Sequence, residues 1–99
     1  MIVVLGTFDL DPEDRDRFID SKRAQVEHTL TEAGCLDYGF SLDPDDPGRV
    51  RLTERWESMA ALTAHVAALR AAPQGDRGPR VRDHAISVID GELVEGLFG

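Results

Sequence analysis

A predicted β-hairpin between residues 35 and 57 constrains the fold of this chain more than any other segment. Four larger apolar side chains alternate with small or polar residues in its first strand: Leu36, Tyr38, Phe40 and Leu42. This period of two indicates a half-buried strand. The segment 43–49 is rich in Asp, Pro and Gly, which favour a turn. The alternation resumes with Val50, Leu52 and Trp56, and Glu54 places a carboxylate on the same apolar face.

The flanking segments predict two helices and two further strands. Residues 2–8 form an apolar run that favours a strand, and residues 81–90 predict the last strand. Asp11 is the expected N-cap of the first helix, Pro12 lies in its first turn, and Gly34 is the expected stop. Its buried stripe is expected to hold five side chains: Phe18, Ile19, Val26, Leu30 and Ala33. Ser58 is the expected cap of the second helix, whose buried face should hold Met59, Leu62, Val66 and Leu69, with His65 beside them at its edge.

The order of these elements is β-α-β-β-α-β, which predicts an α+β, ferredoxin-like fold within a single domain, residues 1–99. Strands one and four carry apolar residues of both parities, so the sheet face opposite the helices also needs cover. Two sheets packed face to face predict a homodimer, a dimeric α+β barrel. Residues 91–99 form an apolar tail that we expect to cross that seam, with four large side chains: Leu93, Val94, Leu97 and Phe98.

Composition excludes some classes of binding partner and indicates a cellular compartment. The 99 residues carry a formal net charge of −8, which argues against nucleic acid or an anionic membrane as partner. No apolar stretch approaches the length of a membrane span, and residues 1–5 lack the charged lead-in of a signal peptide. The lone Cys35 suits a cytoplasmic location and is expected to be a small buried side chain. Three histidines without clustered carboxylates or thiols predict no metal site, and no glycine-rich motif predicts a redox cofactor.

Four short sequence segments resemble those of a known family: residues 34–38, 43–47, 54–58 and 61–65. Over about residues 1–69 the chain resembles the antibiotic biosynthesis monooxygenase family. The resemblance implies a dimeric barrel with a pocket between each sheet and its helices. Members include cofactor-free oxygenases of phenolic polyketides and quinols, with haem-degrading relatives. Ala68, Arg70 and Ala71 stand where members often carry a serine, a second histidine and an aromatic residue. Thr7 stands where the haem-degrading branch has an Asn, so haem chemistry is not expected.

His65 is the leading candidate for a catalytic base, because an imidazole can take a phenolic proton near neutral pH. The electron-rich anion that results would itself reduce oxygen. The alternative is a structural histidine bonded to a carbonyl group. His28 is expected to be solvated.

The candidate substrate-binding residues are Tyr38, Trp56, Thr7 and His84. Tyr38 would either bond a quinone oxygen or cap the core with its hydroxyl. Trp56 would either stack on a flat substrate or fill the core. His84 is in phase with Ile86 and Val88 and would face the interior.

Glu54 and Arg55 are interpreted as structural residues. An ion pair between Glu54 and an arginine, within the chain or across the dimer seam, is the expected role of this carboxylate. The sequence therefore predicts a cofactor-independent monooxygenase of a phenolic, quinol or polyketide-like aromatic molecule. A dimeric small-molecule-binding protein without oxygenase activity, or an isomerase-like relative, is the alternative.

Overall fold

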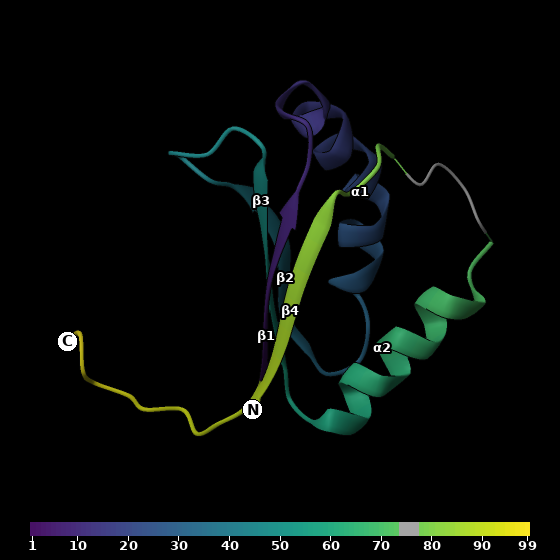
Figure 1. The fold of residues 1–99 in the computed structure, drawn as a ribbon. Helices are drawn as coiled ribbons and strands as arrows, with labels where there is room; N and C mark the ends of the chain where they lie inside the picture. Colours follow the sequence, from purple (N-terminus) through teal and green to yellow (C-terminus); the bar gives the residue numbers. More distant parts are fainter. Residues whose placement is uncertain (74–77) are drawn as a thin grey trace.

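The computed structural model describes residues 1–73 and 78–99, and these form one four-stranded antiparallel sheet with two helices on one face (Figure 1). The elements, in chain order, are β1 (Ile2–Asp9), a short 3-10 turn (Pro12–Asp14), α1 (Arg15–Thr29), β2 (Cys35–Leu42), β3 (Arg49–Trp56), α2 (Met59–Ala71) and β4 (Asp83–Asp90). The strand order is β2-β3-β1-β4. The α+β, ferredoxin-like β-α-β-β-α-β prediction is confirmed.

The main core lies between the helices and the inner sheet face. Its buried members are Ile2, Val4, Tyr38, Leu52, Trp56 and Leu62. A second cluster around Leu10, Phe18 and Val50 fills the other end of the layer. Each large apolar side chain buried in this way contributes about 1.5–3 kcal/mol relative to exposure. The alternation predicted for β3 is confirmed, because every second side chain from Val50 to Trp56 is buried.

A β-bulge near the start of β2 changes which residues face the core. Cys35 pairs with Trp56, but the next pair along the ladder is Asp37 with Arg55, so Leu36 is an extra residue. A bulge of this kind shifts the inward and outward alternation by one position. Leu36 is therefore 44% exposed, contrary to the sequence-based prediction, and Cys35 packs against the main core instead.

The predicted ends of α1 need correction. The Asp11 carboxylate caps no helix, because it accepts a hydrogen bond from Arg82 Nη1 at 3.0 Å. The helix ends at Thr29, and Leu30 is 51% exposed, so the predicted stripe stops one turn early. Gly34 lies beyond this end with a positive φ of 80°, and a Cβ there would lie 2.6 Å from that of Ala61. Its role is thus a close approach to α2.

Helix α2 begins as predicted, because Ser58 Oγ accepts the Ala61 N–H at 3.1 Å. Leu62 and His65 are its buried residues. Met59 and Leu69, which were expected on the buried face, are 47% and 37% exposed, so α2 buries less of its apolar face than predicted. The helix packs by its first two turns and diverges from the sheet toward its C-terminal end (Figure 1).

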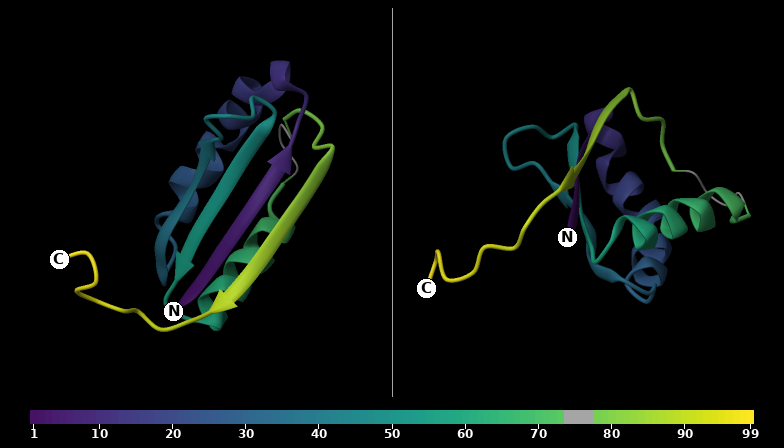
Figure 2. Two further views of the ribbon diagram at one scale, coloured as in Figure 1. Left: turned by 60° about the vertical axis from the view of Figure 1, so that its left-hand side comes forward. Right: turned by 90° about the horizontal axis from the view of Figure 1, so that it is seen from below.

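The outer sheet face is uncovered in the single chain. Leu5 and Ile89 are exposed there, on neighbouring strands β1 and β4. After β4, residues 91–99 run away from the domain on the side opposite the helices (Figure 2). The tail side chains Leu93, Val94, Leu97 and Phe98 are all exposed. Among residues 1–73 and 78–99, no helix is long and apolar enough to cross a membrane.

Candidate functional site

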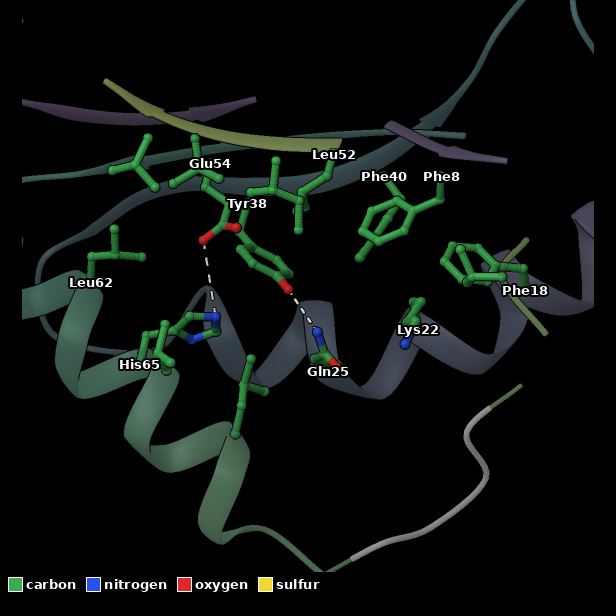
Figure 3. A pocket seen from close by; sticks show the side chains of 16 residues that line it. Phe8, Phe18, Lys22, Gln25, Tyr38, Phe40, Leu52, Glu54, Leu62 and His65 are labelled. Atoms are coloured by element: carbon green, nitrogen blue, oxygen red, sulfur yellow. Dashed lines mark hydrogen bonds and ion pairs between the residues drawn. The ribbon is translucent and has the colours of Figure 1, made fainter. Parts of the chain in front are cut away.

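A cavity of about 350 Å³ lies between the inner sheet face and the two helices (Figure 3). Val4, Leu52, Ile86 and Val88 line its sheet side. Phenylalanines from β1, α1 and β2 and aliphatic side chains from α2 complete most of the remaining wall: Phe8, Phe18, Phe40, Leu62, Val66 and Leu69. Five polar side chains also line it: Lys22, Gln25, Tyr38, Glu54 and His65. A mostly apolar cavity with a few polar groups is typical of a small-molecule site.

His65 is the best-positioned of the predicted site residues. Only 2% of it is exposed, and it lines the cavity from the second turn of α2. Its Nδ1 lies 3.1 Å from Oε1 of Glu32, in the turn that follows α1. The ring also lies against Trp56, with centroids 4.8 Å apart, and against the Tyr38 ring at 5.3 Å. Packing on two rings and one carboxylate holds the imidazole in a single orientation.

Glu54 has partners other than the arginine that the sequence predicts. Its Oε1 accepts the Trp56 Nε1–H at 2.9 Å and lies 4.0 Å from Nε2 of His65 (Figure 3). Burial raises the pKa of the Glu54 carboxyl, while the Trp56 hydrogen bond and the charge of His65 oppose this shift. Arg55 points to the opposite sheet face, where its Nε lies 3.9 Å from Asp37 Oδ2. Glu54 is thus a cavity residue, and within the described part of this chain its partners are not arginines.

Tyr38 projects from β2 into the cavity. Its hydroxyl accepts a 2.7 Å hydrogen bond from Gln25 Nε2 of α1. Burial raises the pKa of Tyr38 to about 12, although the Gln25 hydrogen bond acts in the other direction. The phenol therefore stays protonated near neutral pH and retains a proton that it can donate to a ligand oxygen.

Three predicted substrate-binding residues do not join this group. Trp56 is fully buried behind His65 and is absent from the described residues that line the cavity, so it belongs to the core. Thr7 lies on the outer sheet face, among Leu5, Arg51 and Ser87. His84 does lie on the inner face, stacked on Phe8 at 6.4 Å, but it is exposed at the sheet edge and outside the cavity lining. Tyr38, Glu54 and His65 are the predicted residues that the fold brings together.

Sequence reasoning missed Gln25 and Glu32. Gln25 follows Phe18 by seven positions, so helical spacing places it on the same face as a buried residue. This signal was present. Glu32 lies in the turn between α1 and β2, where no periodic pattern indicates direction, so its contact with His65 depends on tertiary packing. In the described part of the chain, no group of three or more His, Cys, Asp or Glu residues is arranged to hold a metal ion.

Solved structures of other proteins share this fold. A protein from Deinococcus radiodurans, provisionally named an antibiotic biosynthesis monooxygenase, superposes with a TM-score of 0.76 over the whole of both chains, at 23% identity. The Mycobacterium tuberculosis protein Rv0793 has a TM-score of 0.70 at 25% identity, over 96% of this chain and 98% of its own.

An uncharacterized protein of Synechocystis is 31% identical over 64 residues, or 65% of this chain. The match spans 44% of that protein's length, so this chain corresponds to less than half of the curated relative. The sequence model of one family, described as antibiotic biosynthesis monooxygenase, matches residues 1–71. These residues contain β1 to α2 and all five polar residues of the cavity. The chain belongs to the antibiotic biosynthesis monooxygenase family.

Proposed function

We propose that this protein is a cofactor-independent monooxygenase of a small phenolic, quinol or polyketide-like aromatic molecule. One observation carries the proposal: a buried histidine, held by a carboxylate, lines a mostly apolar cavity. Family membership supports oxygenase chemistry in this position. The volume of about 350 Å³ is near the lower end of the range for small-molecule sites, which favours a compact ligand of a few rings.

His65 acts first in the proposed reaction, as the base that removes an acidic proton from the substrate. With an anthrone-type substrate, the anion transfers electrons to dioxygen and a carbon–oxygen bond forms, which gives a peroxide. The proton held by His65 then returns to the peroxide. Elimination of water breaks the O–O bond and the remaining C–H bond and leaves a ketone. The methylene carbon loses four electrons and one dioxygen gains four, with one oxygen atom in the ketone and one in water.

The apolar wall assists this reaction by excluding water. A desolvated anion is more reactive toward oxygen than a hydrated one, and the closed surroundings protect the peroxide from side reactions. The Tyr38 hydroxyl retains a proton and can hydrogen-bond an oxygen atom of the ring system. The aromatic residues Phe8, Phe18 and Phe40 supply surfaces against which a flat molecule packs.

Oxygen consumption by metal-free protein tests the proposal, with a panel of hydroquinones and anthrones as substrates. The His65→Ala variant should lose about 10²–10⁴-fold in kcat, the range for removal of a general base. His28→Ala is the matched control, because His28 is exposed in α1, away from the cavity. Absence of oxygen uptake with every substrate, or an undiminished rate in His65→Ala, would reject the oxygenase function.

A second candidate function is a small-molecule-binding protein without oxygenase activity. It is favoured by the internal hydrogen bonds of the cavity, since His65 Nδ1 is engaged by Glu32 and the Tyr38 hydroxyl by Gln25. Ligand binding without oxygen consumption would support this alternative over the first.

The functional unit in this proposal is a cytoplasmic homodimer. The exposed apolar residues of the outer face, with Leu5 on β1 and Ile89 on β4, supply the surface for a second copy. The apolar tail leaves the domain on that same side (Figure 1). The lone Cys35 suits a reducing compartment.

A further inference from the structure

The two ring nitrogens of the buried His65 each lie near the carboxyl group of a different glutamate. Glu32 Oε1 lies 3.1 Å from Nδ1, and Glu54 Oε1 lies 4.0 Å from Nε2. The two glutamates differ in surroundings, because the Glu32 side chain is 19% exposed whereas that of Glu54 is 8% exposed. Their roles toward His65 therefore differ.

The Glu32 contact sets the tautomer of His65. A carboxylate accepts hydrogen bonds and does not donate them, so Nδ1 carries the hydrogen and donates it to Glu32. In the neutral ring Nε2 is then the acceptor, with its lone pair directed toward Glu54 and the cavity wall. Nε2 is thus available to take a proton from a ligand.

The Glu54 carboxyl has surroundings that favour its neutral form. Within the described part of the chain its charged neighbour is His65, and no lysine or arginine forms an ion pair with it. Burial raises its pKa. Its Oε1 already accepts the indole N–H of Trp56, which fixes the orientation of the group. A neutral carboxyl that is held in place can donate one hydrogen bond through its other oxygen.

The imidazole and the Glu54 carboxyl are neighbours in the cavity wall without a hydrogen bond to each other. At 4.0 Å, Nε2 and Glu54 Oε1 are too far apart for a direct hydrogen bond. Both residues line the cavity and converge at one end of it (Figure 3). Among the described residues, two further titratable side chains line the cavity: Tyr38, whose hydroxyl is directed at Gln25, and Lys22, whose Nζ lies 5.3 Å from the centre of the Phe18 ring. A ligand oxygen in the cavity, beside these two groups, can therefore contact both the imidazole and the carboxyl.

We propose that Glu54 acts as a neutral carboxylic acid that donates a hydrogen bond to the same ligand oxygen whose proton His65 accepts. Glu32 is a positioning residue and Trp56 orients Glu54. The resulting anion is then held by two donors, the Glu54 O–H and the Nε2–H formed by the transfer. The site selects ligands with an acidic hydroxyl, which it binds as the anion. This inference rests on the cavity of the proposed function, but it does not require oxidation of the ligand.

Binding of 4-nitrophenol tests the inference, because phenol and phenolate forms absorb at different wavelengths. Below the pKa of the free phenol, the wild-type protein should bind the probe with the phenolate spectrum. The methyl ether 4-nitroanisole, which has no acidic proton, should bind at least tenfold more weakly. Equal binding of the two probes, or no binding of 4-nitrophenol, would overturn the inference.

Two substitutions at Glu54 separate a neutral donor from a negative charge. Glu54→Gln keeps a neutral hydrogen-bond donor and an oxygen for the Trp56 indole, so the dissociation constant for 4-nitrophenol should stay within about threefold. Glu54→Leu removes the donor and should weaken binding about ten- to hundredfold, the range for a hydrogen bond to a charged group. Glu57→Gln, at an exposed position next to Trp56, is the charge-matched control.

Circular dichroism shows whether each Glu54 variant is folded, and either folded variant is enough to test the inference. A loss of binding in folded Glu54→Gln would show that the negative charge is needed and would overturn the inference. Unchanged binding in folded Glu54→Leu would do the same. Oxygen uptake is measured separately on the same samples, so phenolate binding without oxygen consumption would reject the oxygenase and leave this inference in place.

Discussion

Glu32 Oε1 and His65 Nδ1 lie 3.1 Å apart although 33 positions separate the two residues in the chain. The contact joins the turn after α1 to the buried face of α2, and it fixes the ring in the cavity wall. A carboxylate on one imidazole nitrogen orients the ring and selects its tautomer, as in catalytic triads.

The first prediction concerns this pair. Glu32→Gln should lower kcat/KM about tenfold or more, because the imidazole loses the carboxylate that orients it and selects its tautomer. Nitrogen NMR should show a less uniform tautomer for His65, with exposed His28 and His84 as internal references. Glu27→Gln, a change of the same charge in α1 outside the cavity lining, should alter neither observable. An unchanged NMR spectrum in Glu32→Gln would contradict the positioning role.

The second prediction concerns the pH dependence of folding stability. The pKa of Glu54 is raised in the folded state above its usual 4.5, so the folded protein holds this proton at pH values where the unfolded chain has lost it. The associated stability is complete below the unfolded pKa and is lost as the pH rises through the folded pKa. A tenfold difference between the acid dissociation constants of the folded and unfolded states corresponds to about 1.4 kcal/mol.

The isosteric variant provides the measurement. Glu54→Gln does not ionise at this position, so its free energy of unfolding should increase relative to that of wild type as the pH rises from about 4 to about 8. Urea denaturation at several pH values measures this difference. A constant difference across the range would indicate that Glu54 has the same pKa in the folded and unfolded states.

The third prediction concerns the hydrogen bond between Gln25 and Tyr38. Tyr38→Phe removes the acceptor of the 2.7 Å contact and should destabilise the fold by about 1 kcal/mol. The double variant Tyr38→Phe with Gln25→Leu should be less destabilised than the sum of the single changes. Each single change leaves one polar group, the Gln25 amide or the Tyr38 hydroxyl, without its partner, whereas the double variant removes both groups. Strict additivity in denaturant unfolding would argue against the coupling.

The fourth prediction concerns access to the cavity. Val88 is exposed on β4 and lines the cavity, so Val88→Trp should fill part of its volume and weaken phenol binding at least tenfold with little loss of stability. Leu42→Trp is the control, since Leu42 is similarly exposed at the end of β2 but outside the cavity lining. Equal binding by both variants would place the ligand elsewhere.

The fifth prediction concerns self-association. Leu5→Glu places a charge on the exposed apolar part of the outer face and should convert a dimer to a monomer in light scattering. Leu30→Glu, at a similarly exposed position at the end of α1, should leave the mass unchanged. A monomeric wild-type protein at micromolar concentration would refute the dimer.

Much of the fold was predictable because local patterns carry the information. The alternation in β3, the Ser58 cap and the order of elements follow from short-range geometry. The failures have local causes too. The bulge at Leu36 reversed the predicted facing only at the start of β2, and Asp11 bonded Arg82, 71 positions away, rather than its own helix. The local residue pattern of a single sequence predicts neither the bulge nor a hydrogen bond between such distant residues.

The sequence by itself determined which face of the hairpin is buried, that a carboxylate lies on that face, and that His65 shares the buried side of α2. These follow from the period of two in strands and the 3.6-residue helical repeat. Only the tertiary structure decided which polar groups meet. It placed Glu32 on His65, turned Trp56 away from the cavity to bond Glu54, and put Thr7 on the opposite sheet face. The physical reason is that such contacts depend on how helices pack on a sheet, which distant residues decide together.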